Sequence, residues 1–276
     1  MRESPAAHSV DLAAAGAPAV EVLSAHKTYP NGTVALQPVE LTVQEGEFIT
    51  LLGPSGCGKS TLLKMVAGLL EPTDGRLLLW RKPVAQLETT QRKLAFVFQA
   101  PTLMPWASVA TNVRLPLDLA GLPRAEADAR VTEALALVGL TRFADSLPRA
   151  LSGGMQMRVS IARSLVVQPN LLLMDEPFGA LDEITRHKLD SDLLALWREK
   201  RLTVIFVTHS IHEAVFLSNR VVMMAARPGR IVEEVVIDEP YPRTQDFMVT
   251  PRFAEYAKRL QDSLLRASAD TDEEKI

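Results

Sequence analysis

EFITLLGPSGCGKSTLLKMVAGLL, residues 47–70, joins an apolar run to a glycine-rich loop and then to an amphipathic segment. The apolar run predicts a buried strand, and the amphipathic segment predicts a helix. Within the loop, the glycines Gly53 and Gly58 are followed by Lys59 and Ser60 at the spacing of a phosphate-binding loop. Glycines let backbone N–H groups turn toward phosphate oxygens, and the N-terminal end of the helix stabilises the same anion. This stretch therefore predicts an α/β fold with an anion site where a strand meets a helix.

The chemistry of a nucleoside triphosphate explains the side chains of this loop. Lys59 would reach the β and γ phosphates, and the Ser60 hydroxyl would bind Mg²⁺. ATP and Mg²⁺ are therefore the expected cofactors. A glycine turn that only caps a helix is the plain structural alternative. Cys57 is interpreted as a tolerated loop residue rather than a redox switch. The remaining loop residues are assigned to the same ATP site: Pro54, Ser55, Gly56, Cys57 and Thr61.

Composition limits the other function classes. The chain has 276 residues, which favours one large domain or a domain with a small lobe. A net charge of -3 argues against a protein that coats nucleic acid. The single cysteine excludes an internal disulfide, and no apolar run reaches the roughly 18 residues of a membrane span. Residues 1–19 lack the pattern of a secretory signal and are expected to form a disordered tail.

Hydrophobic patterning predicts alternating strands and helices along the rest of the chain. Two apolar strands, at 170–176 and 202–209, are interpreted as parallel and buried. The segment 101–123 carries four prolines and fits a helical pattern only loosely. Other strands are expected at 19–29, 33–43, 74–80, 93–99, 220–225 and 227–237, and helices at 125–138, 153–166, 184–200 and 251–266.

The strand at 170–176 ends in a pair of carboxylates, within LLLMDEP. Functional groups gather at the carboxyl ends of parallel strands, so Asp175 and Glu176 would lie near the γ phosphate of a bound nucleotide. Asp175 would hold Mg²⁺ through water, and Glu176 would act as general base on the attacking water. The structural alternative is a loop that these residues merely open and solvate.

A third motif, LSGGMQ at 151–156, lies between the phosphate loop and this strand. With the other two motifs it resembles the ATP-binding cassette (ABC) family, from about residue 20 to residue 240. The resemblance implies an α/β phosphate-loop NTPase core with a mixed sheet, an antiparallel β subdomain, and a helical subdomain at about 100–165 that carries the signature motif. Residues 241–276 would then form a C-terminal helix and an acidic tail.

The resemblance also implies roles for four further residues. Tyr29 would stack on adenine, and Gln99 would sense Mg²⁺ and the γ phosphate. Asp182 would be the D-loop aspartate, and His209 would be the switch histidine on the γ phosphate. The structural alternatives are a turn aromatic for Tyr29, a solvated strand-end amide for Gln99, a helix N-cap for Asp182 and a strand-end histidine for His209.

In this family the signature residues complete the ATP site of a second subunit. Ser152, Gly153 and Gly154, with Gln156, would face the γ phosphate held by the partner. The resemblance therefore implies a head-to-tail dimer, with two ATP molecules between the subunits.

The segment after Gln99 suggests what the dimer acts on. Leu103, Met104, Pro105 and Trp106 would form an exposed groove for a helix of a membrane subunit, or alternatively a satellite core cluster. This phrase resembles ATPase subunits of bacterial nitrate, sulfonate and taurine importers. Such a subunit hydrolyses ATP as a peripheral protein on the cytoplasmic face of the membrane. Its partners are transmembrane permease subunits and, indirectly, a solute-binding protein, with no nucleic acid.

Two other functions stay open at the level of sequence. A soluble cassette acting on nucleic acid or the ribosome usually has two cassettes or a long insertion, and neither is found here. A non-hydrolysing nucleotide-gated binding module is disfavoured by Glu176 and His209.

Overall fold

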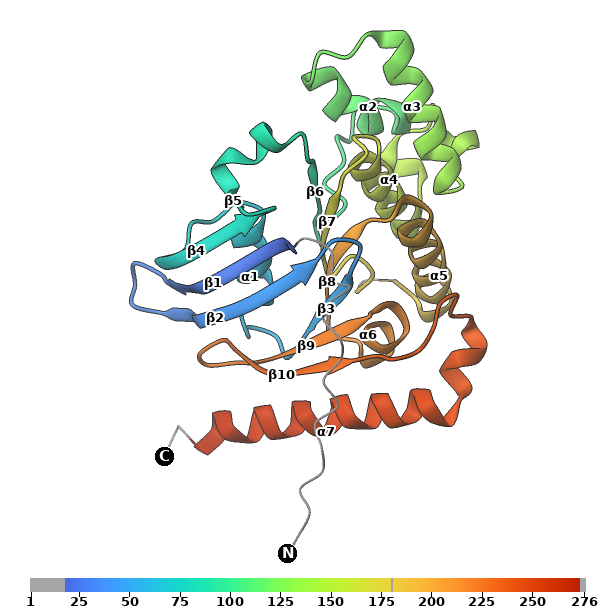
Figure 1. Cartoon of the computed structure of the whole chain (residues 1–276). Helices are drawn as coiled ribbons and strands as arrows, with labels where there is room; N and C mark the ends of the chain where they lie inside the picture. Colours follow the sequence, from blue (N-terminus) through green and yellow to red (C-terminus); the bar gives the residue numbers. More distant parts are fainter. Residues whose placement is uncertain (1–17, 180, 274–276) are drawn as a thin grey trace, which may run out of the picture.

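A six-stranded sheet lies at the centre of the computed structural model, which describes residues 18–179 and 181–273 (Figure 1). Its strand order is β10-β9-β3-β8-β7-β6, and all neighbouring strands are parallel except β9 and β10, which pair antiparallel. The predicted mixed sheet is therefore confirmed. The strands are β3 (Phe48–Leu52), β6 (Leu94–Val97), β7 (Leu171–Asp175), β8 (Thr203–Thr208), β9 (Arg220–Ala225) and β10 (Arg230–Val236).

The central strands are apolar on both faces because each face supports its own core. In β7, Leu171 and Leu173 face one hydrophobic cluster, whereas Leu172 and Met174 face another. This alternation follows from the two-residue period of a strand. The carboxyl end of β7 is thereby held rigidly, and Asp175 is its last residue.

One face of the central sheet is covered by helix α1 (Lys59–Val66) and a second, antiparallel sheet. This sheet has the order β2-β1-β4-β5 and lies on the left in Figure 1. Buried residues of both sheets and of α1 form a single cluster, which includes Val20, Leu62 and Leu171. The strands are β1 (Pro18–Thr28), β2 (Val34–Gln44), β4 (Asp74–Leu79) and β5 (Lys82–Pro83).

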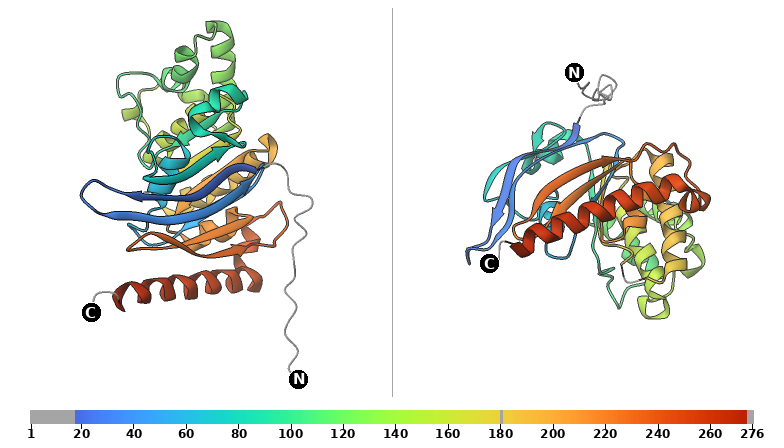
Figure 2. Two further views of the ribbon diagram at one scale, coloured as in Figure 1. Left: turned by 60° about the vertical axis from the view of Figure 1, so that its left-hand side comes forward. Right: turned by 90° about the horizontal axis from the view of Figure 1, so that it is seen from below.

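The other face is covered by helices α5 (Glu183–Lys200), α6 (Ile211–Leu217) and α7 (Pro251–Glu273). The predicted helix at 184–200 is confirmed, and the one at 251–266 extends to Glu273. Helix α7 runs beneath β9 and β10 and contacts α6 (Figure 2). Of the tail expected at 1–19, residues 1–17 lie outside the described residues, as do residues 274–276, whereas Pro18 and Ala19 already belong to β1, so the predicted end of the tail is too late by two residues.

Three helices form a lobe with a hydrophobic cluster of its own, seen at the upper right of Figure 1. They are α2 (Val109–Leu119), α3 (Arg124–Leu137) and α4 (Gly153–Leu165). Helices α3 and α4 confirm the predictions to within one residue. Short 3₁₀ turns occur here at Thr141–Phe143 and Pro148–Ala150, and elsewhere at Val84–Thr90 and Gln245–Val249.

Helix α2 is regular although it contains Pro116, whereas the sequence fits a helical pattern only loosely in this segment. Proline removes a backbone donor and disfavours a helix interior. The Ser108 side chain accepts a hydrogen bond from the Thr111 amide and caps the first turn. Val113 and Leu117, four residues apart, are buried in the core of the lobe. Burial of this face offsets the local cost of the proline.

A buried arginine fastens the C-terminal part of the chain to α6. The Arg243 guanidinium donates to the carbonyl oxygens of Val215, Phe216 and Ser218 at the end of α6, at 3.0, 3.1 and 2.9 Å. It also donates to the carbonyl of Ile237 at 3.1 Å. Burial lowers the pKa of this guanidinium, and the carbonyl oxygens satisfy its donors.

Replacing Arg243 by methionine is expected to lower the free energy of unfolding by about 3 kcal/mol, since several buried carbonyl groups lose their donor. Thermal unfolding would show this as a fall in Tm of about 6–12 °C. Arg259→Met is the matched control, because this arginine pairs with Glu233 while half exposed. Equal shifts for the two variants would contradict the anchoring role.

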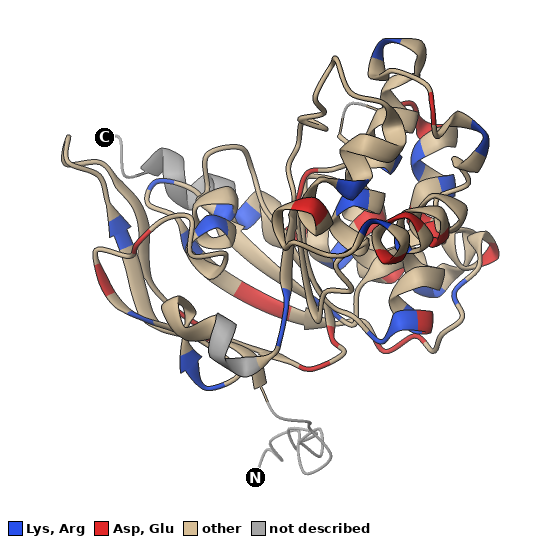
Figure 3. Ribbon diagram, turned by 90° about the horizontal axis from the view of Figure 1, so that it is seen from above, with Lys and Arg blue, Asp and Glu red and all other residues tan. Residues whose placement is uncertain are grey.

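The surface carries charges of both signs. Helices α3 and α5 each carry both basic and acidic residues (Figure 3). In the described part of the chain, no helix has the length and apolar content needed to cross a bilayer.

Candidate nucleotide-binding site

The predicted phosphate loop connects β3 to α1, and two of its glycines are required by its geometry. Gly58 caps α1 with a φ of 89°, in the left-handed region. A Cβ atom there would also lie 2.9 Å from the carbonyl oxygen of Ala35. At Gly53 a Cβ atom would overlap the carbonyl oxygen of Met224. The loop can therefore follow this path only with glycine at both positions.

The ammonium group of Lys59 lies inside the loop, and the residue is 4% exposed. Its Nζ donates to the carbonyl oxygens of Gly53 at 2.8 Å and Pro54 at 3.0 Å. Among the described residues, no carboxylate forms an ion pair with it. A buried cation with only neutral partners is costly, so the site is arranged for an anionic ligand.

Two oxygen groups meet beside the lysine, from α1 and from the end of β7. The Ser60 hydroxyl donates to Asp175 Oδ1 at 2.7 Å. Both groups are hard oxygen donors of the kind that Mg²⁺ prefers. The structure thus brings together two of the three predicted metal ligands. The third, Gln99, comes shortly after β6.

Glu176 is held in a strained backbone conformation at the end of β7. Its φ is 47°, which is uncommon for a residue with a side chain, and its amide donates to the Val207 carbonyl at 3.0 Å. Gln99 Nε2 donates to Glu176 Oε2 at 3.3 Å. His209 Nε2 lies 2.5 Å from Glu176 Oε1. This short contact joins the two side chains directly.

The other ring nitrogen of His209 connects it to the phosphate loop. His209 Nδ1 lies 3.0 Å from the Gly53 carbonyl oxygen and 3.5 Å from Lys59 Nζ. The histidine therefore bridges the loop and Glu176.

These groups line one cavity of about 360 Å³. Cys57 lies behind the loop, and burial raises the pKa of its thiol, which disfavours the reactive thiolate. Ala35 of β2 was missed by sequence analysis, since an alanine carries no chemical signal. The lining residues are Ala35, Ser55, Gly56, Gly58, Lys59, Ser60, Thr61, Gln99, Glu176 and His209.

Tyr29 is not among these lining residues. It lies at the turn after β1, where its carbonyl accepts from the Gly32 amide at 2.9 Å. Its ring is partly exposed, and Lys27 Nζ lies 5.9 Å from the ring centre. The ring is therefore accessible to a ligand, and its role in stacking on adenine stays a prediction.

The signature residues lie at the start of α4. Ser152 caps this helix by accepting from the Met155 amide at 3.3 Å. Gly153 is exposed, and open space surrounds the position of a Cβ atom there. Gly154 is buried, and a Cβ atom would lie 3.0 Å from Thr185 Cγ2 of α5. Gln156 donates to the Pro148 carbonyl at 3.1 Å. Contacts within the chain thus account for Gly154 and Gln156, whereas Ser152 and Gly153 face outward.

Asp182 caps the N-terminus of α5, which is the structural role that the sequence also suggested for it. Its Oδ1 accepts from the Thr185 amide at 2.9 Å, and this hydrogen bond lowers the pKa of the carboxyl. The capping role leaves the predicted D-loop role untested.

The predicted docking segment is divided between surface and core. Trp106 is 78% exposed and Pro105 is also exposed. Leu103, by contrast, packs against the hydrophobic cluster of the helical lobe. Leu103 thus belongs to the core of the lobe, whereas Pro105 and Trp106 are accessible, and the docking role of this segment stays a prediction.

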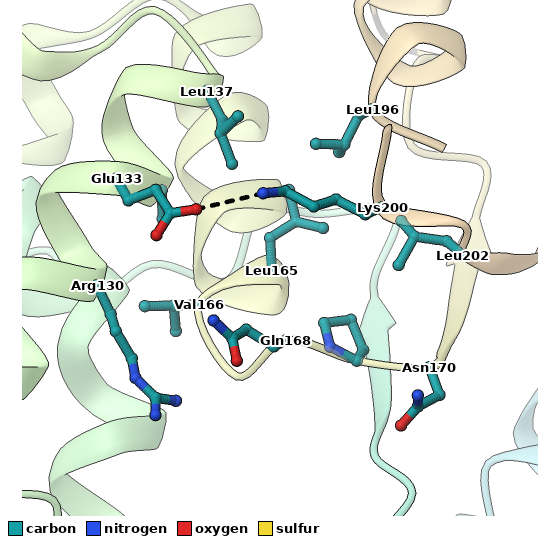
Figure 4. A pocket seen from close by; sticks show the side chains of 12 residues that line it. Arg130, Glu133, Leu137, Leu165, Val166, Gln168, Asn170, Leu196, Lys200 and Leu202 are labelled. Atoms are coloured by element: carbon teal, nitrogen blue, oxygen red, sulfur yellow. Dashed lines mark hydrogen bonds and ion pairs between the residues drawn. The ribbon is translucent and has the colours of Figure 1, made fainter. Parts of the chain in front are cut away.

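A different cavity, of about 250 Å³, lies between α3 and the end of α5 (Figure 4). Leu137, Leu165 and Leu196 line it, and a 3.2 Å ion pair joins Lys200 to Glu133 beside it. None of the predicted site residues lines this cavity.

Fold and site together define the class of the protein as a phosphate-loop nucleotide hydrolase. Residues 36–179 match the family model described as ABC transporter. The chain belongs to this family, and it is an ATP-binding, ATP-hydrolysing member. The resemblance seen in the sequence is thus confirmed.

Three similar proteins show how far the likeness extends. The taurine import ATP-binding protein TauB of Rhizobium johnstonii is 44% identical over 241 residues, which cover 86% of this chain and 90% of TauB. The nitrate import ATP-binding protein NrtD of Synechococcus elongatus is 42% identical over 255 residues, covering 90% and 92%. The ATP-binding cassette MJ0796, solved as a dimer in a post-hydrolysis state bound to ADP and Pi, has a TM-score of 0.72 and 35% identity, covering 80% and 100%.

Proposed function

We propose that this chain is the ATPase subunit of an importer for a small solute, acting as a pair of copies on transmembrane permease subunits. The observation that carries the nucleotide site is the buried Lys59 ammonium, which has no carboxylate partner within residues 18–179 and 181–273 and lines a cavity with Glu176 and His209. The cassette would span residues 20–240, with its helical part at about 100–165 and a C-terminal extension at 241–276.

Mg²⁺ would be held by Ser60, Asp175 and Gln99. The donor set fits this ion, because the Ser60 hydroxyl and Asp175 Oδ1 are already 2.7 Å apart. When bound, the ion would neutralise charge on the phosphate oxygens. Among the described residues, no group of three or more His, Cys, Asp or Glu side chains could hold a metal. Phosphate oxygens and water would therefore complete the coordination.

Hydrolysis would use the Glu176–His209 pair. Glu176 would take a proton from the water that attacks the γ phosphorus, while the bond to the ADP oxygen breaks. His209 would keep the carboxylate in place and contact the γ phosphate, and Lys59 would bind the β and γ phosphates. The left-handed backbone of Glu176 supports this role, since such strain is typical of functional residues.

The signature residues would complete the site across a dimer. Ser152 and Gly153 are exposed at the N-terminus of α4, where amide groups and the helix dipole favour an anion. The dimeric structure of MJ0796 supports a pair as the working unit. In such a pair, Asp182 at the start of α5 would lie near the same interface between the two subunits.

The relatives support import as the process that is driven. TauB and NrtD are import subunits for taurine and nitrate, so a small nitrate-, sulfonate- or taurine-like solute is proposed. The exposed Trp106 and Pro105 would contact a helix of the permease. The subunit would then lie on the cytoplasmic face of the membrane, with a solute-binding protein on the other side. The nucleic-acid alternative has no support among these relatives.

This proposal is tested by co-expressing the tagged chain with the membrane proteins encoded beside its gene. The complex is expected to co-purify, to require Mg²⁺, and to hydrolyse ATP faster when the solute-loaded binding protein is added. Trp106→Ala would weaken co-purification without changing ATP binding. Stimulation by RNA or ribosomes, with no binding to the permease, would contradict it.

A further inference from the structure

Two carboxylates that sequence analysis did not single out are buried behind Glu176 and His209. Asp190 on α5 is 1% exposed, and Glu213 on α6 is 4% exposed. Asp190 Oδ1 and Glu213 Oε1 are fully enclosed and form no hydrogen bond with the described residues. The nearby cation is Arg186, whose Nε lies 3.7 Å from Glu213 Oε1. Two buried negative charges beside one cation are strongly unfavourable, so this cluster must hold a proton.

Glu213 reaches the loop that carries His209. Its Oε2 accepts a hydrogen bond from the Thr208 hydroxyl, and Thr208 Oγ1 accepts from the Ser210 amide at 2.9 Å. Both neighbours of His209 are therefore fixed by the Glu213 carboxylate.

Arg186 reaches the loop that follows Glu176. It donates to the carbonyl oxygen of Leu181 at 2.8 Å and to that of Phe178 at 3.4 Å. Together with Glu213, it lines a cavity of about 300 Å³ that Glu176 and His209 also line. The loops on the two sides of the Glu176–His209 contact are thus joined through one ion pair.

We propose that Arg186, Asp190 and Glu213 form a coupling cluster that positions Glu176 against His209, and that it does so only while Asp190 is protonated. The proposal rests on the roles proposed for Glu176 and His209. Ionised Asp190 would compete with Glu213 for Arg186, because Asp190 lies one helical turn from Arg186 on α5 and Arg186 pairs with Glu213. Arg186 would then release Glu213, and the two loops would lose their shared anchor. Arg186 and Glu213 are positioning residues, because their contacts join them to the two loops rather than to the cavity of the phosphate loop, and Asp190 would act through Arg186.

The groups facing Asp190 are Arg186 on its own helix and Glu213 on α6, and Glu213 in turn faces Glu176 and His209. Burial, helped by the charge of Glu213, raises the pKa of Asp190 to about 8. Burial also raises the pKa of Glu213. Asp190 would therefore be protonated at neutral pH and would ionise in mildly alkaline solution.

The test compares the pH dependence of kcat for the wild type and Asp190→Asn in the complete transporter. Wild-type kcat is expected to fall about tenfold between pH 7 and pH 9, as the protonated fraction falls. Asp190→Asn keeps a neutral group of the same shape, so its kcat should change by less than about twofold over this range. The KM for ATP should be unaffected. Asp192→Asn is the control. Asp192 lies on the same helix, but it is exposed and pairs with Arg158, so the pH dependence of kcat in this variant should match that of the wild type.

Thermal unfolding provides a readout that is independent of hydrolysis. The folded-state pKa of Asp190 lies above its ordinary value of 3.8, so the stability that this group contributes is lost as pH rises toward 8. Asp190→Asn has no carboxyl group to titrate at this position. The difference between its Tm and that of the wild type should therefore increase in favour of the variant from pH 5 to pH 8. An advantage that does not change with pH would overturn the protonation of Asp190.

A second substitution covers the case in which Asp190→Asn fails to fold. Glu213→Gln removes the ion pair with Arg186 that joins the two loops, so its kcat should already be low at pH 7 and should lack the alkaline decline. Parallel pH profiles for the wild type and whichever of these variants folds would overturn the coupling. Turnover of Glu176→Gln within about twofold of the wild type would instead contradict the proposed general base, which separates the two failures.

Discussion

Replacing Glu176 by glutamine is expected to lower kcat for ATP hydrolysis by about 10²–10⁴-fold. The amide keeps the volume of the side chain, and it can still contact Gln99 and His209. It cannot take a proton from water. Binding of ATP should be preserved, because Lys59, Ser60 and the loop amides are unchanged.

Steady-state hydrolysis and a fluorescence titration with an ATP analogue measure the two quantities separately. Size-exclusion chromatography with ATP should also show the variant accumulating as a dimer, since the nucleotide is no longer consumed. Glu199→Gln is a suitable control, because this glutamate is exposed on α5 and pairs with Lys200. Turnover of Glu176→Gln within twofold of the wild type would refute the assignment.

Replacing Gly153 by aspartate is expected to reduce hydrolysis by more than about 10²-fold while ATP binding to the monomer stays unchanged. Within its own chain the new carboxylate has open space, and it lies at a helix N-terminus, where a negative charge is favourable. The subunit should therefore fold normally. Across the dimer, the same charge would repel the γ phosphate held by the partner.

Gly153→Asn separates charge from size, and it should retain more activity than the aspartate. Gly154→Asp is a poorer test, because a side chain there would press on Thr185 within the same chain. Equal loss of monomer ATP binding and of hydrolysis in Gly153→Asp would show that this residue acts within its own subunit.

The parts of the site that could be predicted are those encoded in short stretches. The phosphate loop needs glycine at 53 and 58 because of its own path, and Asp175 and Glu176 follow a strand whose apolar run is plain. His209, directly after β8, was assigned from the family resemblance instead. These positions meet in one cavity because parallel strands present their carboxyl ends at one edge of a sheet.

What escaped prediction depends on contacts between distant segments. Helix α2 contains a proline that local rules disfavour, and burial of Val113 and Leu117 outweighs it. Nothing in the local pattern shows that Gly154 packs on Thr185. The burial of Asp190 and Glu213 near each other is likewise a property of how α5 meets α6.

The central claim is that each ATP site combines the phosphate loop of one subunit with the signature residues of the other. Mixing two inactive variants tests it most directly. Lys59→Met removes the phosphate ligand, and Gly153→Asp blocks the signature surface. In a mixed dimer both defects fall in one site, which leaves the other site intact.

Hydrolysis should therefore be absent from each variant alone and should return in an equal mixture to about one quarter of the wild-type rate, since half of the dimers are mixed and each has one intact site. The variants are combined under conditions that allow subunits to exchange, and formation of mixed dimers is verified with two different tags. No recovery of hydrolysis in verified mixed dimers would contradict a site shared between subunits.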